Sequence, residues 1–255
     1  MRNQISRLWM AWILASLLAL PAFASQPSSS KPNEQKIQQD INKQLQENKA
    51  WKNVQANVNN GVVTLTGTVD LFRDKAKLDE KIRKRSGVAE LKDDVLVAGA
   101  SVADLKLQET LADKLRYDRI YFGHVFNNLT LEVKNGVATV GGVVHDSTDK
   151  ASALAEVTGT PGVKGVVDQI KIAPTSFYDD RLRLQIARAI YRRLPPEYAL
   201  DPQAPIRIVV VNGNVDLYGV VDSKIDRQLA EFQARSVPGV FSVNDHLVLP
   251  SEIRQ

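Results

Sequence analysis

Three histidines, His124, His145 and His246, are the residues of this chain best suited to acid–base or metal chemistry, because the sequence has no cysteine. A catalytic or metal-binding histidine needs a nucleophile or further ligands beside it. Three similar segments of the chain, described below, show what replaces two of these histidines: Asp70 and Asp222 correspond to His145, and Asp94 and Gln169 correspond to His246. Such variation is typical of surface positions, so the sequence predicts no catalytic residue, no metal site and no cofactor.

A second candidate for chemistry is the densest basic cluster, Lys81, Arg83, Lys84 and Arg85, at the C-terminal end of a helix predicted over residues 74–85. Cations at that end interact favourably with the helix dipole, by about 0.3–1 kcal/mol each. The alternative is a patch that binds anions. We favour the helix-dipole interpretation.

The helix that opens the third similar segment carries the most suggestive surface. At 100° per residue, three arginines form one stripe bordered by two apolar side chains: Arg181, Arg188 and Arg192, with Leu184 and Tyr191. Basic residues beside exposed apolar ones suit an anionic membrane surface, where each arginine adds about 1 kcal/mol. Two interpretations stay open: a lipid-binding site, or packing of Leu184 and Tyr191 against a neighbouring segment with the arginines solvated.

The stretch from Tyr117 to Phe126 is rich in aromatic residues, although only 6% of the whole chain is aromatic. It either forms an exposed loop that binds a partner or fills the contact between two neighbouring segments. We favour the second interpretation, because the links between segments are short and bring this stretch near its neighbours.

An internal repeat organises the chain. Three Asn-Gly pairs recur at spacings of 75 and 77 residues, Asn60-Gly61, Asn135-Gly136 and Asn212-Gly213, and a Gly-Val pair recurs at the same spacings, at Gly87, Gly162 and Gly239. Asn-Gly between two alternating apolar runs favours a type I′ turn, which needs positive φ at both central residues. Each pair therefore predicts a β-hairpin.

Each repeat also predicts two helices and a third strand. Before each hairpin, apolar residues lie four apart on one helical face: Ile37, Ile41 and Leu45, then Leu107, Leu111 and Leu115, then Leu182, Ile186 and Ile190. After each hairpin come a second helix and an alternating strand, which favours a right-handed crossover with parallel strands. The predicted fold class is α+β: three tandem αββαβ units, each a mixed three-stranded sheet packed against two helices.

The N-terminus predicts export. Residues 1–24 have the form of a cleavable signal peptide, with Arg2 and Arg7 in the n-region, then an apolar stretch of 13 residues, Leu8 to Leu20, and an Ala-Phe-Ala cleavage site. The alternative is a retained membrane anchor, but a membrane span needs about 20 apolar residues, more than this stretch has. Residues 25–33 have the composition of a disordered linker, followed by repeat 1 (34–99), repeat 2 (102–173) and repeat 3 (177–250).

Charge and cysteine content limit the partners. Loss of two arginines with the signal peptide lowers the formal net charge from +4 to +2, and this excess is too small to indicate that the chain binds nucleic acid. Without cysteine the chain offers no site for a lipid anchor attached through a cysteine.

Repeats 2 and 3 carry insertions between the first helix and the hairpin. The distance from the first core residue of the helix to the asparagine of the turn is 23 residues in repeat 1 (from Ile37), 28 in repeat 2 (from Leu107) and 30 in repeat 3 (from Leu182).

These residues resemble the BON family: a helix with apolar residues four apart, then N-G-V-x-x-L-x-G-x-V, a helix, and G-V-x-x-V before the last strand. Repeat 1 matches with Asn60-Gly61, Leu65, Gly67 and Val69; repeat 2 has Val140 in place of leucine; repeat 3 departs most, with four prolines before its first strand. The resemblance implies an αββαβ fold, a periplasmic location, a role in envelope integrity or stress tolerance, phospholipid binding, and no catalysis.

The leading hypothesis is a non-enzymatic periplasmic binding protein that associates weakly with anionic phospholipid surfaces or envelope proteins. The alternative is a periplasmic stress chaperone or protein-binding scaffold. A hydrolase would need a nucleophile and a base, and comparison of the repeats does not reveal them.

Overall fold

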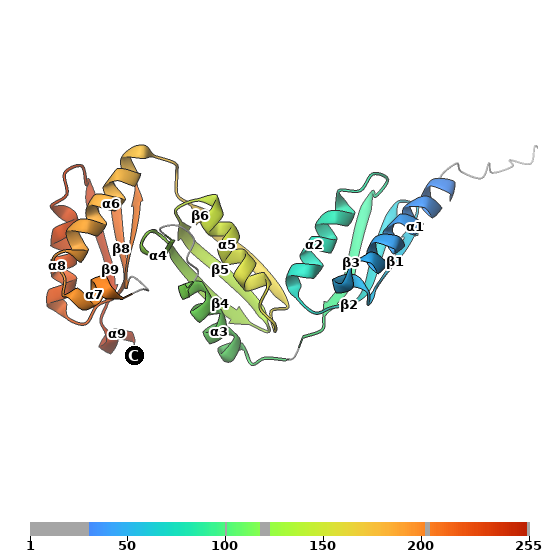
Figure 1. Ribbon diagram of the computed structural model, residues 1–255, viewed down its shortest axis with the longest axis horizontal. Coiled ribbons are helices and arrows are strands. Elements are labelled where there is room, and N and C mark those ends of the chain that lie inside the picture. The colour runs from blue at the N-terminus through green and yellow to red at the C-terminus, as the bar shows by residue number, and fades with distance from the viewer. Residues whose placement is uncertain (1–30, 100, 118–122, 202–204, 254–255) are drawn as a thin grey trace, which may run out of the picture.

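The three repeats follow one another in a row, with repeats 1 and 3 at opposite ends (Figure 1). The computed structural model describes residues 31–99, 101–117, 123–201 and 205–253. The predicted signal peptide lies outside these residues. The first helix begins at Lys31, so the last three residues of the segment predicted to be a disordered linker, 31–33, belong to this helix.

Every repeat has a helix, a hairpin, a second helix and a third strand. Repeat 1 contains α1 (Lys31–Glu47), the 3₁₀-helix η1 (Lys49–Trp51), β1 (Val54–Asn59), β2 (Val62–Val69), α2 (Phe72–Arg83) and β3 (Glu90–Val97). Repeat 2 contains α3 (Asp104–Tyr117), α4 (Gly123–Phe126), β4 (Asn128–Lys134), β5 (Val137–Val144), α5 (Ser147–Thr158) and β6 (Gly165–Ile172). Repeat 3 contains α6 (Phe177–Tyr191), α7 (Pro196–Leu200), β7 (Ile206–Val211), β8 (Asn214–Val220), α8 (Lys224–Arg235) and β9 (Ser242–Val248), followed by α9 (Pro250–Ile253).

The sheet topology confirms the predicted fold class. In each repeat the first two strands pair antiparallel and the third joins the second in parallel, giving the orders β1-β2-β3, β4-β5-β6 and β7-β8-β9. The longer connections of repeats 2 and 3 contain the short helices α4 and α7.

The Asn-Gly turns have the backbone that the sequence predicts. Asn60 has φ 50° and Gly61 φ 77°, and the pairs in repeats 2 and 3 are within a few degrees of these values. The glycine in the middle of β2 is also required, because Gly67 has φ 115° and a Cβ there would lie 2.1 Å from the carbonyl oxygen of Asn53. The corresponding glycines of repeats 2 and 3, Gly142 and Gly219, face the same constraint.

Each repeat encloses its own apolar core between the sheet and the two helices. The residues predicted at four-residue spacing in the first helices are buried there, Leu115 only partly. Within the described residues, no helix has the length and apolar character needed to cross a bilayer.

Repeats 2 and 3 meet through the aromatic segment. Helix α4 of repeat 2 contacts β7 of repeat 3. Phe126, at the end of α4, is 6% exposed and belongs to the apolar core of repeat 3. The prediction that this segment fills the contact between two repeats is therefore confirmed for Phe126, whereas residues 118–122 lie outside the described residues.

Candidate functional site

Helix α6 presents one face to the core and another to solvent. The helix begins after Ser176, whose hydroxyl oxygen accepts a hydrogen bond from the backbone N–H of Asp179 at 3.2 Å. Leu182, Ile186 and Ile190 are buried in the core of repeat 3. The opposite face is therefore free to contact a partner.

Four of the five residues predicted to bind lipid share that exposed face. Arg181, Arg188 and Arg192 are exposed, and Leu184 lies among them. Among the described residues, none of these three guanidinium groups forms an ion pair, unlike that of Arg183. Cations without a carboxylate partner keep their charge available for an external anion.

Tyr191 lies apart from the other four. It packs against the core of repeat 3, and its hydroxyl accepts a hydrogen bond from the backbone N–H of Ile206 at 3.1 Å and donates to the carbonyl of the same residue at 2.9 Å. Burial raises the pKa of Tyr191 to about 12. Tyr191 lies at the border of the arginine stripe, and its hydrogen bonds to Ile206 in β7 hold its side chain against its own repeat.

Phe177 is a member of the exposed face that the sequence interpretation missed. It is 90% exposed and lies four residues before Arg181 and seven before Leu184. These spacings place it in line with the stripe. The same helical spacing is visible in the sequence, although the predicted stripe begins at Arg181.

The buried side of α6 holds a set of charges that anchors the helix. Asp179 is fully buried and accepts hydrogen bonds from the backbone N–H groups of Asn212 and Gly213, each at 2.9 Å. Arg183 is 2% exposed; it pairs with Asp180 and donates to the carbonyl of Val210 at 2.5 Å. The start of α6 is thereby fixed to the hairpin of repeat 3.

The position of Arg183 has a structural role in all three repeats. Gln38 in repeat 1 and Gln108 in repeat 2 occupy the corresponding place, one residue after the first core residue of the helix. Their amide oxygens accept hydrogen bonds from the backbone N–H of Val58 at 2.8 Å and of Val133 at 3.1 Å. In each repeat the side chain at this position therefore joins the first helix to the first strand by a hydrogen bond. In repeat 3 the donor is the guanidinium group of Arg183.

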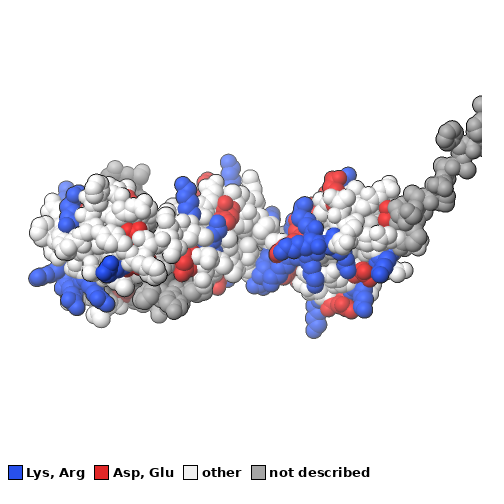
Figure 2. Space-filling view, turned by 90° about the horizontal axis from the view of Figure 1, so that it is seen from above, with Lys and Arg blue, Asp and Glu red and all other residues white. Residues whose placement is uncertain are grey.

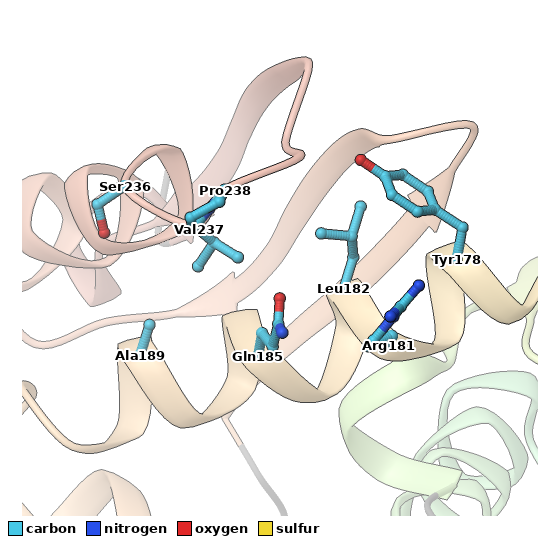
Figure 3. A pocket seen from close by; sticks show the side chains of 8 residues that line it. All are labelled: Tyr178, Arg181, Leu182, Gln185, Ala189, Ser236, Val237 and Pro238. Atoms are coloured by element: carbon cyan, nitrogen blue, oxygen red, sulfur yellow. The ribbon is translucent and has the colours of Figure 1, made fainter.

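A groove of about 560 Å³ runs along α6 (Figure 3). Side chains of α6 line one wall and residues of the loop after α8 line the other: Tyr178, Arg181, Leu182, Gln185 and Ala189, then Ser236, Val237 and Pro238. The Tyr178 hydroxyl donates to the carbonyl of Gly239 at 2.8 Å and closes one end. This lining contains no nucleophile paired with a base.

His145 lies where repeats 2 and 3 meet. Its Nε2 is 3.0 Å from Oδ1 of Asp180 in repeat 3, and its Nδ1 is 3.5 Å from Oδ2 of Asp146. With Asp146 and Asp149 it forms a group whose ligand atoms lie within 4.8 Å of one another. Asp146, however, caps α5, and the hydrogen bonds from the backbone N–H groups of Asp149 and Thr148 lower its pKa.

The N-terminus of α5 carries the positive end of a helix dipole, which disfavours a metal cation and favours carboxylates. We therefore assign the group around His145 to capping and to the contact between repeats.

His246 stacks on Tyr218 with ring centroids 4.6 Å apart and lies 3.1 Å from Asp216, as expected of a cross-strand surface pair. The side chain of His124 lies outside the described part of the chain.

The basic cluster of α2 has partners within repeat 1. Its four cations each meet one: Arg83 lies 3.7 Å from Asp79, Lys84 2.5 Å from Glu80, Arg85 3.7 Å from Asp40, and Lys81 5.5 Å from the centroid of the Trp51 ring. Basic and acidic side chains accordingly alternate on repeat 1 in Figure 2. These contacts favour a structural interpretation of this cluster.

The three repeats correspond to a known domain family. The sequence matches the BON domain model three times, over residues 33–99, 103–174 and 184–250. The chain belongs to the BON domain family. Each BON match falls on one αββαβ repeat, although the third begins within α6, and BON domain proteins are often periplasmic and generally lack enzymatic activity.

Other comparisons add little. No curated protein matches the chain. The solved structures that are similar include two of CdsD, a structural protein of the type III secretion system of Chlamydia trachomatis. The C-terminal domain of CdsD is 16% identical, with 83% of this chain and 96% of that chain covered and a TM-score of 0.24; the second CdsD structure is 15% identical, with 85% and 94% covered and a TM-score of 0.22. Such low TM-scores carry no information about the function of this BON protein.

Proposed function

We propose that this BON protein is a non-enzymatic binding protein of the periplasm that associates weakly with anionic phospholipid surfaces and thereby supports envelope integrity under stress. The exposed face of α6 is the proposed contact. The observation that supports it best is the combination on that face of three arginines without an ion-pair partner among the described residues and two exposed apolar side chains, Phe177 and Leu184.

The expected strength follows from the composition of this face. Each arginine near an anionic bilayer contributes about 1 kcal/mol. Partial burial of Leu184 and Phe177 contributes about 1 kcal/mol each, less than the full burial of such side chains. Binding of this size is reversible and depends on salt, because the Debye length is only about 8 Å at physiological ionic strength.

Flotation with liposomes tests the proposal. The mature chain, mixed with liposomes of phosphatidylglycerol and phosphatidylcholine, should rise with the lipid at low salt and remain in the soluble fraction when the liposomes are phosphatidylcholine alone. Raising the salt to about 0.5 M should release the protein. Absence from both lipid fractions at low salt would refute the proposal, and suppression of the aggregation of an unfolded client protein would then favour the chaperone alternative.

A further inference from the structure

The end of repeat 3 where α6 begins exposes aromatic side chains from two different segments, the first turn of α6 and the loop before β9. Phe177 in the first turn of α6 is 90% exposed, and Phe241, in the loop before β9, is 85% exposed. Tyr178 is partly exposed between the start of α6 and the loop after α8. Exposed apolar groups that gather at one site of a protein mark an interaction surface more often than single exposed residues do.

The backbone that carries these aromatic residues is held in place. Ser176 caps the helix at Phe177, and Asp179 joins the same turn to the Asn212-Gly213 hairpin. The backbone N–H of Phe241 donates to the carbonyl of Gly213 at 2.8 Å. Both phenylalanines therefore project from one end of repeat 3 that is anchored at the hairpin.

Repeat 2 shows that the corresponding end can be covered. Phe72, at the start of α2 in repeat 1, packs against the core of repeat 2. The guanidinium group of Arg73 reaches the loop after α5, within 3.1 Å of the place where a Cβ on Gly159 would lie. In repeat 3 the corresponding loop borders the groove of Figure 3, whose described lining belongs entirely to repeat 3.

The charges around this end favour a bilayer as its partner. Seen from above, repeat 3 is largely free of charged side chains, and basic residues lie toward its edge (Figure 2). Arg181 lies one helical turn from Phe177 and is among the arginines without an ion-pair partner in the described structure. Aromatic rings beside an unpaired cation suit the interfacial region of an anionic membrane, where the rings enter and the cation stays at the headgroups.

We propose that repeat 3 enters anionic phospholipid bilayers by the end where α6 begins, with the exposed face of α6 inclined toward the headgroups, Phe177 and Phe241 inserted at the level of the upper acyl chains, and Arg181 at the phosphate groups. This inference rests on the proposed function and adds to it the inserted residues and the orientation. The loop with Phe241 contacts the bilayer together with α6, so the helix does not lie flat on the surface by itself.

Tryptophan scanning tests the insertion. In the mature chain, which lacks Trp9 and Trp12 of the predicted signal peptide, Phe177→Trp and Phe241→Trp each place a fluorophore at the proposed depth, while Trp51 is buried in repeat 1 and gives a constant background. Leu200→Trp is the matched control, because Leu200 is also exposed but lies in α7, at the other end of repeat 3 from the start of α6 (Figure 1). The probes are phosphatidylglycerol liposomes with and without brominated acyl chains.

The expected result is a blue shift and at least about a twofold bromine-dependent loss of emission for Phe177→Trp and Phe241→Trp, and no loss for Leu200→Trp. The double variant Phe177→Ser and Phe241→Ser, at exposed positions, should lower liposome partitioning at least about tenfold. Flotation without quenching at either aromatic position would overturn the insertion and leave headgroup association intact. Equal quenching at Leu200 would overturn the orientation, and absence of flotation would refute both this inference and the proposed function.

Discussion

Phe126→Ala is expected to destabilise repeat 3 by about 3–4 kcal/mol, although Phe126 belongs to repeat 2. The ring is part of the buried core formed by α6, β7 and β8, and among the described residues of repeat 2 no other is a buried member of that core. Truncation removes the transfer free energy of the ring and leaves a cavity at the contact between the repeats. The contact itself should also loosen, since α4 is the part of repeat 2 with the most extensive contact to β7.

Hydrogen exchange measured by mass spectrometry locates this effect, because unfolding of a chain with three cores need not be two-state. Peptides from β7 and β8 should lose protection in Phe126→Ala, and peptides from repeat 1 should not change. Phe232→Ala is the control, as Phe232 is exposed on α8 of the same repeat and should change the stability by less than about 0.5 kcal/mol. Unchanged protection of repeat 3 in Phe126→Ala would contradict the role given to this residue.

Asp179→Ala is expected to destabilise repeat 3 by about 2–4 kcal/mol, because two backbone N–H groups of the hairpin lose their acceptor at a fully buried carboxylate. Repeat 2 offers a matched comparison. Asp104 accepts from the N–H groups of Asn135 at 2.6 Å and Gly136 at 2.9 Å, but it is only half-buried. Water can replace its carboxylate, so Asp104→Ala should cost about 1–2 kcal/mol.

Urea unfolding of the two aspartate variants, followed by hydrogen exchange in the hairpin peptides, checks the difference. Asp179→Asn should fall between Asp179→Ala and the unmodified chain, because the amide oxygen still accepts one bond. Equal destabilisation by Asp179→Ala and Asp104→Ala would show that burial of the carboxylate does not set the size of the effect.

The features predicted correctly from the sequence are local ones. Asn60-Gly61 and its counterparts specify a turn by their own backbone preferences, and Ile37, Ile41 and Leu45 specify a helical face by spacing alone. Three copies of the same pattern also reinforce each prediction. Fold class and the positions of the hairpins follow from such signals.

The start of the first helix differs from the prediction for a physical reason. A stretch with Pro27 and Pro32 and several serines has the composition of a linker, which placed the boundary at Glu34. Proline is nevertheless tolerated in the first turn of a helix, because the N–H that it lacks would have no intrahelical acceptor there. Pro32 is the second residue of α1.

The parts of the site that were not predicted depend on contacts between distant residues. Tyr191 bonds to Ile206, and Arg183 is paired beside the buried Asp179, through the packing of α6 on β7. The contact between His145 and Asp180 joins two repeats. Helical periodicity places a residue on a face, but it cannot show which residue at the border of that face reaches a strand.

Two sets of charge neutralisation test most directly whether the exposed face of α6 is the lipid contact. One variant carries Arg181→Gln, Arg188→Gln and Arg192→Gln; the other carries Lys81→Gln, Arg83→Gln and Lys84→Gln at the C-terminal end of α2, with the same change in net charge. Glutamine keeps helix propensity close to that of lysine and arginine. Partitioning into phosphatidylglycerol liposomes should fall about 100-fold in the α6 variant and less than about threefold in the α2 variant. An equal fall in both variants would show that net charge, and not this face, governs binding and would contradict the account.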